Sequence, residues 1–218
     1  MQKIKKDALG NLVYGKIKLM ILNGALKPGQ KINKKELTEQ LSVSQTPVNE
    51  AIIRLTGEGL IEQQERKGFF IKIFTYQDLK EFFAIRAGME GVALRLCVEE
   101  QPDNTLDKLT HFFDNFSLPL DENEYKKYLK ADQEFHQKII ELSRNSIIIN
   151  FNKNFDFIMK SYQKGLIRPP EETLPEHKAI VKAVRNRDSE KAQQLLIEHH
   201  LKSRKVIKDQ HLKYNTNN

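Results

Sequence analysis

Apolar residues recur at three- and four-residue steps along most of the chain, which is the spacing of one face of an α-helix. The first such face runs from Leu12 to Ile21 and stops before Gly24, a residue type that often ends a helix. Two shorter helical patterns follow, one over residues 34–41 and one in the stretch QTPVNEAIIRLTGEGL. Three helices are therefore predicted in the first 60 residues.

The short segment SVS separates the second helix from the third. Ser44 or Thr46 can cap the third helix, and Pro47 suits its first turn, where no backbone N–H is needed. Two helices joined by a tight turn, the second beginning with small polar residues, are typical of a helix-turn-helix.

A β-hairpin is predicted directly after the third helix. The β-prone runs LIEQQ and FFIKIF flank the segment ERKG. This arrangement places Arg66 and Lys67 at the tip of the hairpin, where Gly68 is free to adopt a positive φ. The first 74 residues therefore predict a winged helix-turn-helix with a small β-hairpin wing.

Only helical periodicities follow, from Thr75 to about Ile207, and no Gly-, Ser- or Pro-rich spacer precedes them. Five turn-like patches interrupt them, namely EEQPDNT, SLPLDENE, RNS, LIRPPEETLPE and RNRD. The predicted fold class is mainly α, with a winged helix-turn-helix domain over residues 1–74 and an all-α bundle over residues 75–218.

Composition places the chain among globular proteins, with 39% hydrophobic and 30% charged residues. No apolar run approaches the ~20 residues of a membrane span, and Lys16 and Lys18 interrupt any signal-peptide core near the N-terminus. A single cysteine, Cys97, fits a reducing compartment. We therefore expect a cytoplasmic protein with no membrane partner.

The net charge of +7 is concentrated in the first third of the 218-residue chain. Up to Phe74 there are 13 Lys and Arg against 7 Asp and Glu, whereas the remainder is nearly balanced. A small domain this basic is the electrostatic footprint of a nucleic-acid binder, because Lys and Arg displace counterions from phosphates.

Several polar residues occupy apolar helical faces in the second domain. Asp132 and His136 are four residues apart, and His177 lies on a stripe of branched apolar residues. In the last helix, successive residues differ by roughly 100°, so the phase favours His199 over His200 as the inward histidine. Either a metal site or a set of buried hydrogen bonds would explain such residues.

The first domain resembles the DNA-binding domain of the GntR family of bacterial regulators. The resemblance covers about fifty residues, including the segments LKPGQKI, LSVSQTPVNEAIIRL and the wing. It implies DNA contacts from Lys35, Ser44, Gln45, Thr46, Asn49, Arg54, Arg66, Lys67 and Gly68.

This chain departs from the family pattern at Gln45 and Asn49, where the family usually has arginine. Gln and Asn pair with adenine, whereas Arg favours guanine and phosphate, so a different operator preference is expected.

The second domain resembles the all-helical FCD effector domain that accompanies this winged helix in the FadR-like subfamily. The resemblance rests on YQDLKEFFAIRAGMEGVAL, DQEFHQKIIELSRN, PEHKAIVKAVRNRDSEKA and IEHHLKS. It implies one divalent metal ion per subunit, and its ligands would be Asp132, His136, His177 and His199. Zinc is the first expectation for such a set, with nickel and manganese as alternatives.

The same resemblance implies that Arg86 anchors a small carboxylic-acid effector, and an ion pair with Glu90 one turn away is the alternative. It also implies a homodimer. His200 is a further departure, because the family commonly has an aliphatic residue at that position.

Taken together, these patterns predict a transcriptional regulator, of the repressor type by family default, and not an enzyme. It would bind a palindromic operator in double-stranded DNA under the control of a small carboxylate at the metal. Two alternatives remain open at the level of sequence. One is a metal-dependent hydrolase or oxygenase that uses the three histidines and Asp132, and the other is a constitutive DNA-binding protein with a structural metal.

Overall fold

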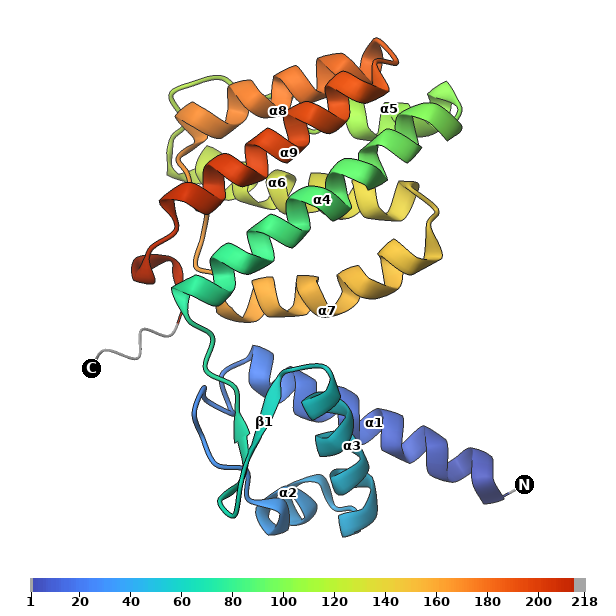
Figure 1. Ribbon diagram of the computed structural model, residues 1–218, viewed down its shortest axis with the longest axis vertical. Helices are drawn as coiled ribbons and strands as arrows, with labels where there is room; N and C mark the ends of the chain where they lie inside the picture. The colour runs from blue at the N-terminus through green and yellow to red at the C-terminus, as the bar shows by residue number, and fades with distance from the viewer. Residues whose placement is uncertain (1, 214–218) are drawn as a thin grey trace. The chain divides into compact units, whose positions relative to one another are not determined.

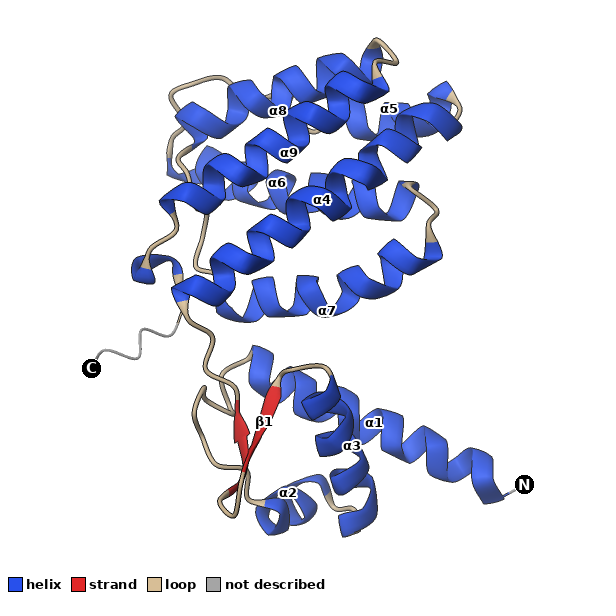
Figure 2. Cartoon of the chain, viewed as in Figure 1, coloured by secondary structure: helices blue, strands red, loops and turns tan. Residues whose placement is uncertain are grey.

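The computed structural model describes residues 2–213, which form two compact units. One unit consists of residues 2–74 together with 157–162, and the other of residues 75–156 and 163–213. Figure 1 follows the course of the chain, and Figure 2 separates its helices from its two strands. No helix within the described residues is long and apolar enough to cross a membrane.

The first unit has the predicted winged helix-turn-helix order. Its helices are α1 (Gln2–Leu22), α2 (Lys34–Leu41) and α3 (Gln45–Gly57). The wing is an antiparallel pair of strands, β1 (Ile61–Gln64) and β2 (Gly68–Ile71).

Local sequence explains the ends of these elements. The Asn33 side chain accepts backbone hydrogen bonds from Lys35 and Glu36 and thereby caps α2. Ser44 is the N-cap of α3 but makes no side-chain cap hydrogen bond. Gly68 has a φ of 105° at the turn of the wing, as the sequence predicted.

Beyond the wing the described chain is helical, as predicted. Its α-helices, in chain order, are α4 (Tyr76–Glu100), α5 (Asp103–Thr110), α6 (Glu122–Leu142), α7 (Ser146–Tyr162), α8 (Pro170–Arg185) and α9 (Ser189–Val206). A short 3₁₀-helix, Asp209–His211, follows α9. The start of α8 corrects the prediction of a turn over LIRPPEETLPE, because the helix begins at Pro170 and contains Pro175. Proline suits the first helical position, so Pro170 agrees with this start, and only Pro175, beside the buried Thr173 and Leu174, lies inside the helix against its local preference.

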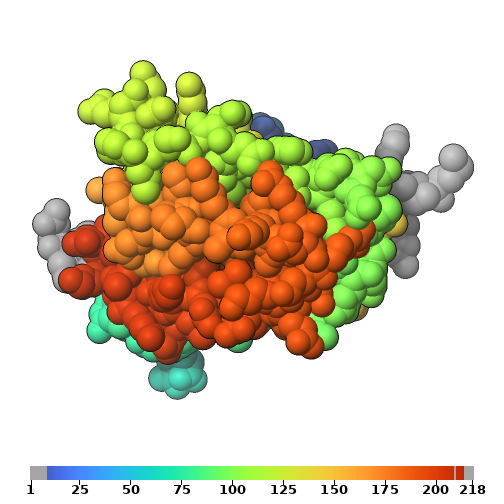
Figure 3. Space-filling view, turned by 90° about the horizontal axis from the view of Figure 1, so that it is seen from above, coloured from blue at the N-terminus to red at the C-terminus, as the bar shows by residue number. Residues whose placement is uncertain are grey.

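Helix α9 packs against both α4 and α8. Figure 3 shows α8 and α9, in orange and red, side by side across one face. The approach of α9 to α4 is unusually close at Gly91, because a Cβ added there would lie 2.6 Å from Cγ1 of Ile197. Glycine at position 91 therefore sets how near these two helices lie.

We expect Gly91→Ala to lower the free energy of unfolding by about 1–3 kcal/mol, because the added methyl group overpacks the contact with Ile197. Gly88→Ala is the matched control in the same helix, since nothing lies within 4 Å of its added Cβ. In that control the free energy of unfolding should rise by up to about 1 kcal/mol, because alanine has the higher helix propensity. Denaturant unfolding followed by circular dichroism measures both values. Equal stabilisation by the two substitutions would contradict the close packing.

Candidate metal centre and DNA-binding face

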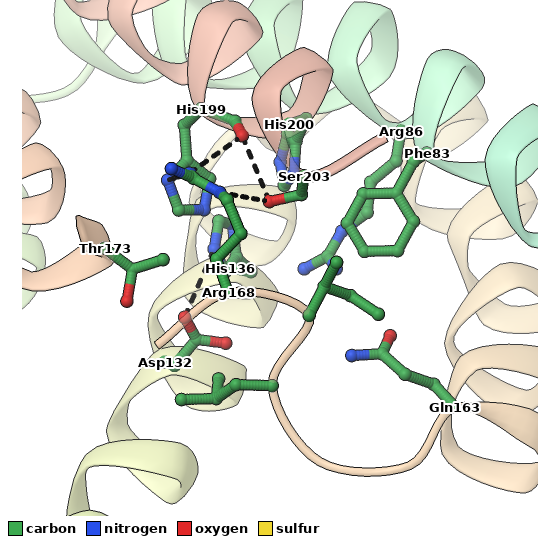
Figure 4. A pocket seen from close by; sticks show the side chains of 12 residues that line it. Phe83, Arg86, Asp132, His136, Gln163, Arg168, Thr173, His199, His200 and Ser203 are labelled. Atoms are coloured by element: carbon green, nitrogen blue, oxygen red, sulfur yellow. Dashed lines mark hydrogen bonds and ion pairs between the residues drawn. The ribbon is translucent and has the colours of Figure 1, made fainter. Parts of the chain in front are cut away.

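Three helices bring four of the predicted residues together inside the helical unit. Asp132 and His136 come from α6, His177 from α8 and His199 from α9. One ligand atom from each lies within 4.8 Å of the others, and the three histidines are buried. Figure 4 shows Asp132, His136 and His199 beside a small cavity.

The distances among these atoms suit a metal ion. Nε2 of His136 and Nε2 of His177 are 3.4 Å apart, and Oδ1 of Asp132 lies 3.5 Å from the latter and 4.0 Å from the former. Two ligands of a tetrahedral ion with bonds of about 2.0–2.1 Å lie roughly 3.3 Å apart. Small movements would therefore close the site around an ion.

A directional chain of hydrogen bonds sets the tautomer of His177. Thr173 Oγ1 donates to the carbonyl of Pro169, and Tyr128 OH donates to Thr173 Oγ1 over 2.7 Å. The phenol oxygen of Tyr128 therefore accepts from Nδ1–H of His177, at 2.8 Å. This leaves Nε2 of His177 with a lone pair that points to the centre.

Carboxylates orient the other two rings in the same way. Nδ1 of His136 lies 2.6 Å from Glu90 Oε2, and Nδ1 of His199 lies 2.9 Å from Glu176 Oε2. An ionised carboxylate only accepts hydrogen bonds, so each Nδ1 carries a proton, and in the neutral imidazole Nε2 then has the lone pair. Partners of this kind typically orient metal-binding histidines.

Electrostatics keep the two carboxylates charged and His177 neutral. Burial alone raises the pKa of Glu90, but Arg86, His136 and His200 outweigh it and hold the pKa well below its usual value. Burial is the main cause that lowers the pKa of His177, with a smaller contribution from His199. A neutral imidazole is the form that binds a metal.

Arg86 lines the same cavity, whose volume is about 30 Å³. Its Nε donates to Glu90, so the ion pair that the sequence suggested is present. Within residues 2–213, no hydrogen bond is formed by the two terminal nitrogens of Arg86.

The sequence predicted that His199 faces inward and that His200 does not. The second part of this prediction is wrong. Both side chains are buried, and Nε2 of His200 lies 2.8 Å from Glu90 Oε2. Helical phase separates adjacent residues by roughly 100°, but α9 has neighbours on two sides, so both directions lead into protein. Glu90, His136 and His200 also lie close enough to suggest a second ion. However, Arg86 already neutralises Glu90, and a cation there would meet the guanidinium.

Sequence reasoning missed three residues that hold the histidines, namely Tyr128, Glu176 and Arg168. Arg168 is a buried guanidinium that bonds Glu176 and the backbone carbonyl of His199. Tyr128 lies one turn before Asp132 on the same face of α6, and this spacing was the available signal. Nothing in the local pattern pointed to Arg168.

The predicted DNA contacts lie on α2, α3, the turn before α3 and the wing. Seven are exposed, and Asn49 and Gly68 are partly buried. The exposed residues are Lys35, Ser44, Gln45, Thr46, Arg54, Arg66 and Lys67.

Arg54 already has partners within this unit. Its guanidinium lies 3.8 Å from the centre of the Tyr14 ring and donates to Asn11 on α1 over 3.0 Å. It also forms an ion pair of 3.4 Å with Glu58. These contacts fasten α3 to α1, and a DNA contact by Arg54 stays a prediction.

Comparison with known proteins identifies the class to which this fold and these residues belong. Residues 9–71 match the family model described as bacterial regulatory proteins, gntR family, and residues 81–202 match the FCD domain. The chain therefore belongs to the gntR family of bacterial regulators that carry an FCD domain. Its expected role as a DNA-binding transcriptional regulator, and not an enzyme, is confirmed by this family and by its relatives.

Three comparisons illustrate the relationship. The uncharacterized HTH-type transcriptional regulator YdhC of Bacillus subtilis (strain 168) is 29% identical over 191 residues, which cover 85% of each chain. The Nta operon transcriptional regulator of Aminobacter aminovorans is 35% identical over 133 residues, 60% of this chain and 61% of the relative. The solved structure of E. coli McbR/YncC shares the fold, with a TM-score of 0.62 at 22% identity, over 89% of this chain and 94% of that one.

Proposed function

We propose that this regulator is a metal-dependent repressor whose operator binding is controlled by a small carboxylate. Residues 1–74 would bind DNA, and residues 75–218 would bind the effector and dimerise. Asp132, His136, His177 and His199 would hold one divalent ion per subunit, zinc being the first candidate for a set of three nitrogens and one oxygen.

The observation that carries the metal proposal is the orientation of the histidines. When both rings are neutral, the Nε2 atoms of His136 and His177 carry lone pairs and face each other at 3.4 Å, and both rings are buried. Two lone pairs repel unless a proton or a cation lies between them, and the hydrogen-bond network assigns the ring protons to the opposite nitrogens. The donors are therefore arranged as a divalent ion requires.

The effector proposal follows from two positive charges at the cavity, the metal ion and Arg86. Four protein ligands fill a tetrahedral ion, so an effector carboxylate would bind by expanding the coordination to five, which zinc accepts. Arg86 lines the same cavity, and its terminal nitrogens can donate two charge-assisted hydrogen bonds to an anion.

A homodimer on a palindromic operator is the arrangement that a single short recognition helix favours. One α3 reaches only a few base pairs, and two related copies read half-sites one helical repeat apart. Ligand binding would change operator affinity if it favours an arrangement with a different spacing between the two α3 helices.

The first test concerns the DNA-binding face. We expect Lys67→Ala to weaken binding to all DNA sequences and to reduce the salt slope by about one, because it removes a phosphate contact. Gln45→Ala and Asn49→Ala should instead change the preferred bases. Selection of binding sites from random DNA, followed by titrations at several salt concentrations, measures both effects. Lys130→Ala, at an exposed position of α6, is the control. The assignment of these DNA contacts is wrong if all three variants bind DNA as the Lys130→Ala control does.

The second test concerns the metal. His199→Ala should lower the bound divalent metal measured by elemental mass spectrometry, and His136→Ala and His177→Ala should do the same. His111→Ala is the control, because its ring is exposed and pairs only with Asp114 among the described residues. Equal metal content in His199→Ala and the native protein would refute the ligand set.

A milder pair of variants examines the orientation of His177. Tyr128→Phe removes the oxygen that accepts from Nδ1–H and should weaken metal binding roughly 10- to 100-fold. Tyr125→Phe makes the same change at an exposed position of α6 and should leave the affinity unchanged. Competition with a chelator of known affinity measures both.

The third test concerns the effector. A screen of small carboxylic acids should find a ligand that raises the melting temperature of the metal-loaded protein more than that of the metal-free protein. That ligand should change operator affinity roughly 5- to 150-fold, corresponding to a coupling of about 1–3 kcal/mol. Arg86→Lys, which keeps the charge but loses the planar fork, should weaken ligand binding. A ligand that stabilises both forms equally, or leaves operator binding unchanged, would indicate a structural ion.

A further inference from the structure

Ile53 is an apolar side chain on the outer side of α3. Its exposed fraction is 66%, whereas Val48, Ile52 and Leu55 of the same helix are fully buried. Helix propensity does not explain an isoleucine here, because β-branched residues are weaker helix formers than Ala, Arg or Lys. Neither packing among the described residues nor local conformation therefore accounts for this side chain.

The position of Ile53 on α3 distinguishes it from a scattered surface residue, which would need no explanation. Successive helical residues differ by roughly 100°, so Ile53 points within about 20° of the direction of Thr46 and about 40° of that of Asn49. These three residues have the i, i+3, i+7 spacing with which a recognition helix in the major groove presents side chains to base edges. Ile53 therefore extends the proposed reading face by one turn.

The directions on either side of Ile53 are both occupied by protein. Ile52, about 100° to one side, is buried, and Arg54, about 100° to the other, lies 3.8 Å from the centre of the Tyr14 ring of α1. Ile53 lies between these two directions and is turned away from the core and from α1. This is the side of α3 that can enter a groove of DNA.

The chemistry of the major groove selects one partner for an aliphatic side chain. Base edges there present hydrogen-bond donors and acceptors, and thymine adds a C5-methyl group. Contact between this methyl group and Ile53 removes apolar surface of both partners from water. A polar base edge in the same place would lose its water without gaining a hydrogen bond. Ile53 therefore favours a thymine.

We propose that Ile53 is a specificity-determining residue that recognises the methyl group of a thymine in each half-site of the operator. This inference rests on the proposed DNA-binding face. It adds a base preference to those expected from Gln45 and Asn49, which pair with adenine through hydrogen bonds.

Replacement of thymine by uracil tests the proposal, because it removes the methyl group and leaves the base pair intact. The probe is the duplex that the full-length native protein selects from random DNA. Each thymine is replaced in turn, symmetrically in both half-sites, and titration at constant salt gives the ratio of the dissociation constants of the uracil and thymine duplexes. At one position or more this ratio should be roughly fourfold per half-site, the effect of burying one methyl group.

The ratio at that position should fall close to one in Ile53→Ala and be partly preserved in Ile53→Val. Leu12→Ala is the matched control, because Leu12 is also 66% exposed but lies on α1, and it should keep the native ratio. Thr46→Ser removes the methyl group of a second residue on the same face and should keep the ratio at this position too. Circular dichroism establishes that the variants are folded.

An effect of uracil on the shape of the duplex would survive in Ile53→Ala, so the comparison isolates the contact. A ratio that survives in this variant, equal binding at every thymine position, or a selected operator without thymine overturns the inference. In each case the proposed DNA-binding face stands if Gln45→Ala or Asn49→Ala changes the preferred bases. Failure of the native protein to select any operator would overturn both.

Discussion

The buried carboxylate of Glu90 is the interaction on which the helical unit depends. Glu90 is 2% exposed; its charge is compensated by Arg86 on its own helix, and it accepts hydrogen bonds from His136 of α6 and His200 of α9. A buried charge that loses its partners is strongly unfavourable, so these contacts hold three helices in one arrangement. The same contacts direct the lone pair of His136 toward Asp132 and His177.

The geometry around Glu90 requires α9 to approach α4 closely. Gly91, the next residue along α4, leaves room for Ile197, and this places His200 within hydrogen-bonding distance of Glu90. The close approach of the two helices at Gly91 and the hydrogen bonds of Glu90 therefore depend on each other. A larger side chain at position 91 would separate the helices and disturb the carboxylate together with the rings that it orients.

The winged-helix unit depends on a different kind of contact. Its core is apolar, but α3 is also fastened to α1 by Tyr14, whose hydroxyl lies 2.8 Å from Glu58 and whose ring faces Arg54. These partly exposed contacts each contribute little to stability. They leave Gln45, Thr46 and Asn49 on the first turns of α3, and this is where a recognition helix reads base edges.

The sequence by itself determined the features that depend on local periodicity and turn chemistry. The helix-turn-helix, the wing at Gly68 and the helical second half followed from apolar spacing, and the convergence of Asp132, His136, His177 and His199 agreed with their positions on apolar faces. Helical phase states the direction of a side chain relative to its own helix. It does not state how many sides of that helix are covered.

Tertiary structure alone therefore decided that His200 is buried beside His199, because α9 lies between two neighbours. It also decided the partners of the histidines, since Tyr128, Glu90 and Glu176 are 49, 46 and 23 residues away from the rings that they orient. The continuation of α8 through Pro175 has the same origin, because Thr173 and Leu174 beside it are buried against other segments. Contacts between distant segments depend on how helices pack, and no local pattern in the sequence records that packing.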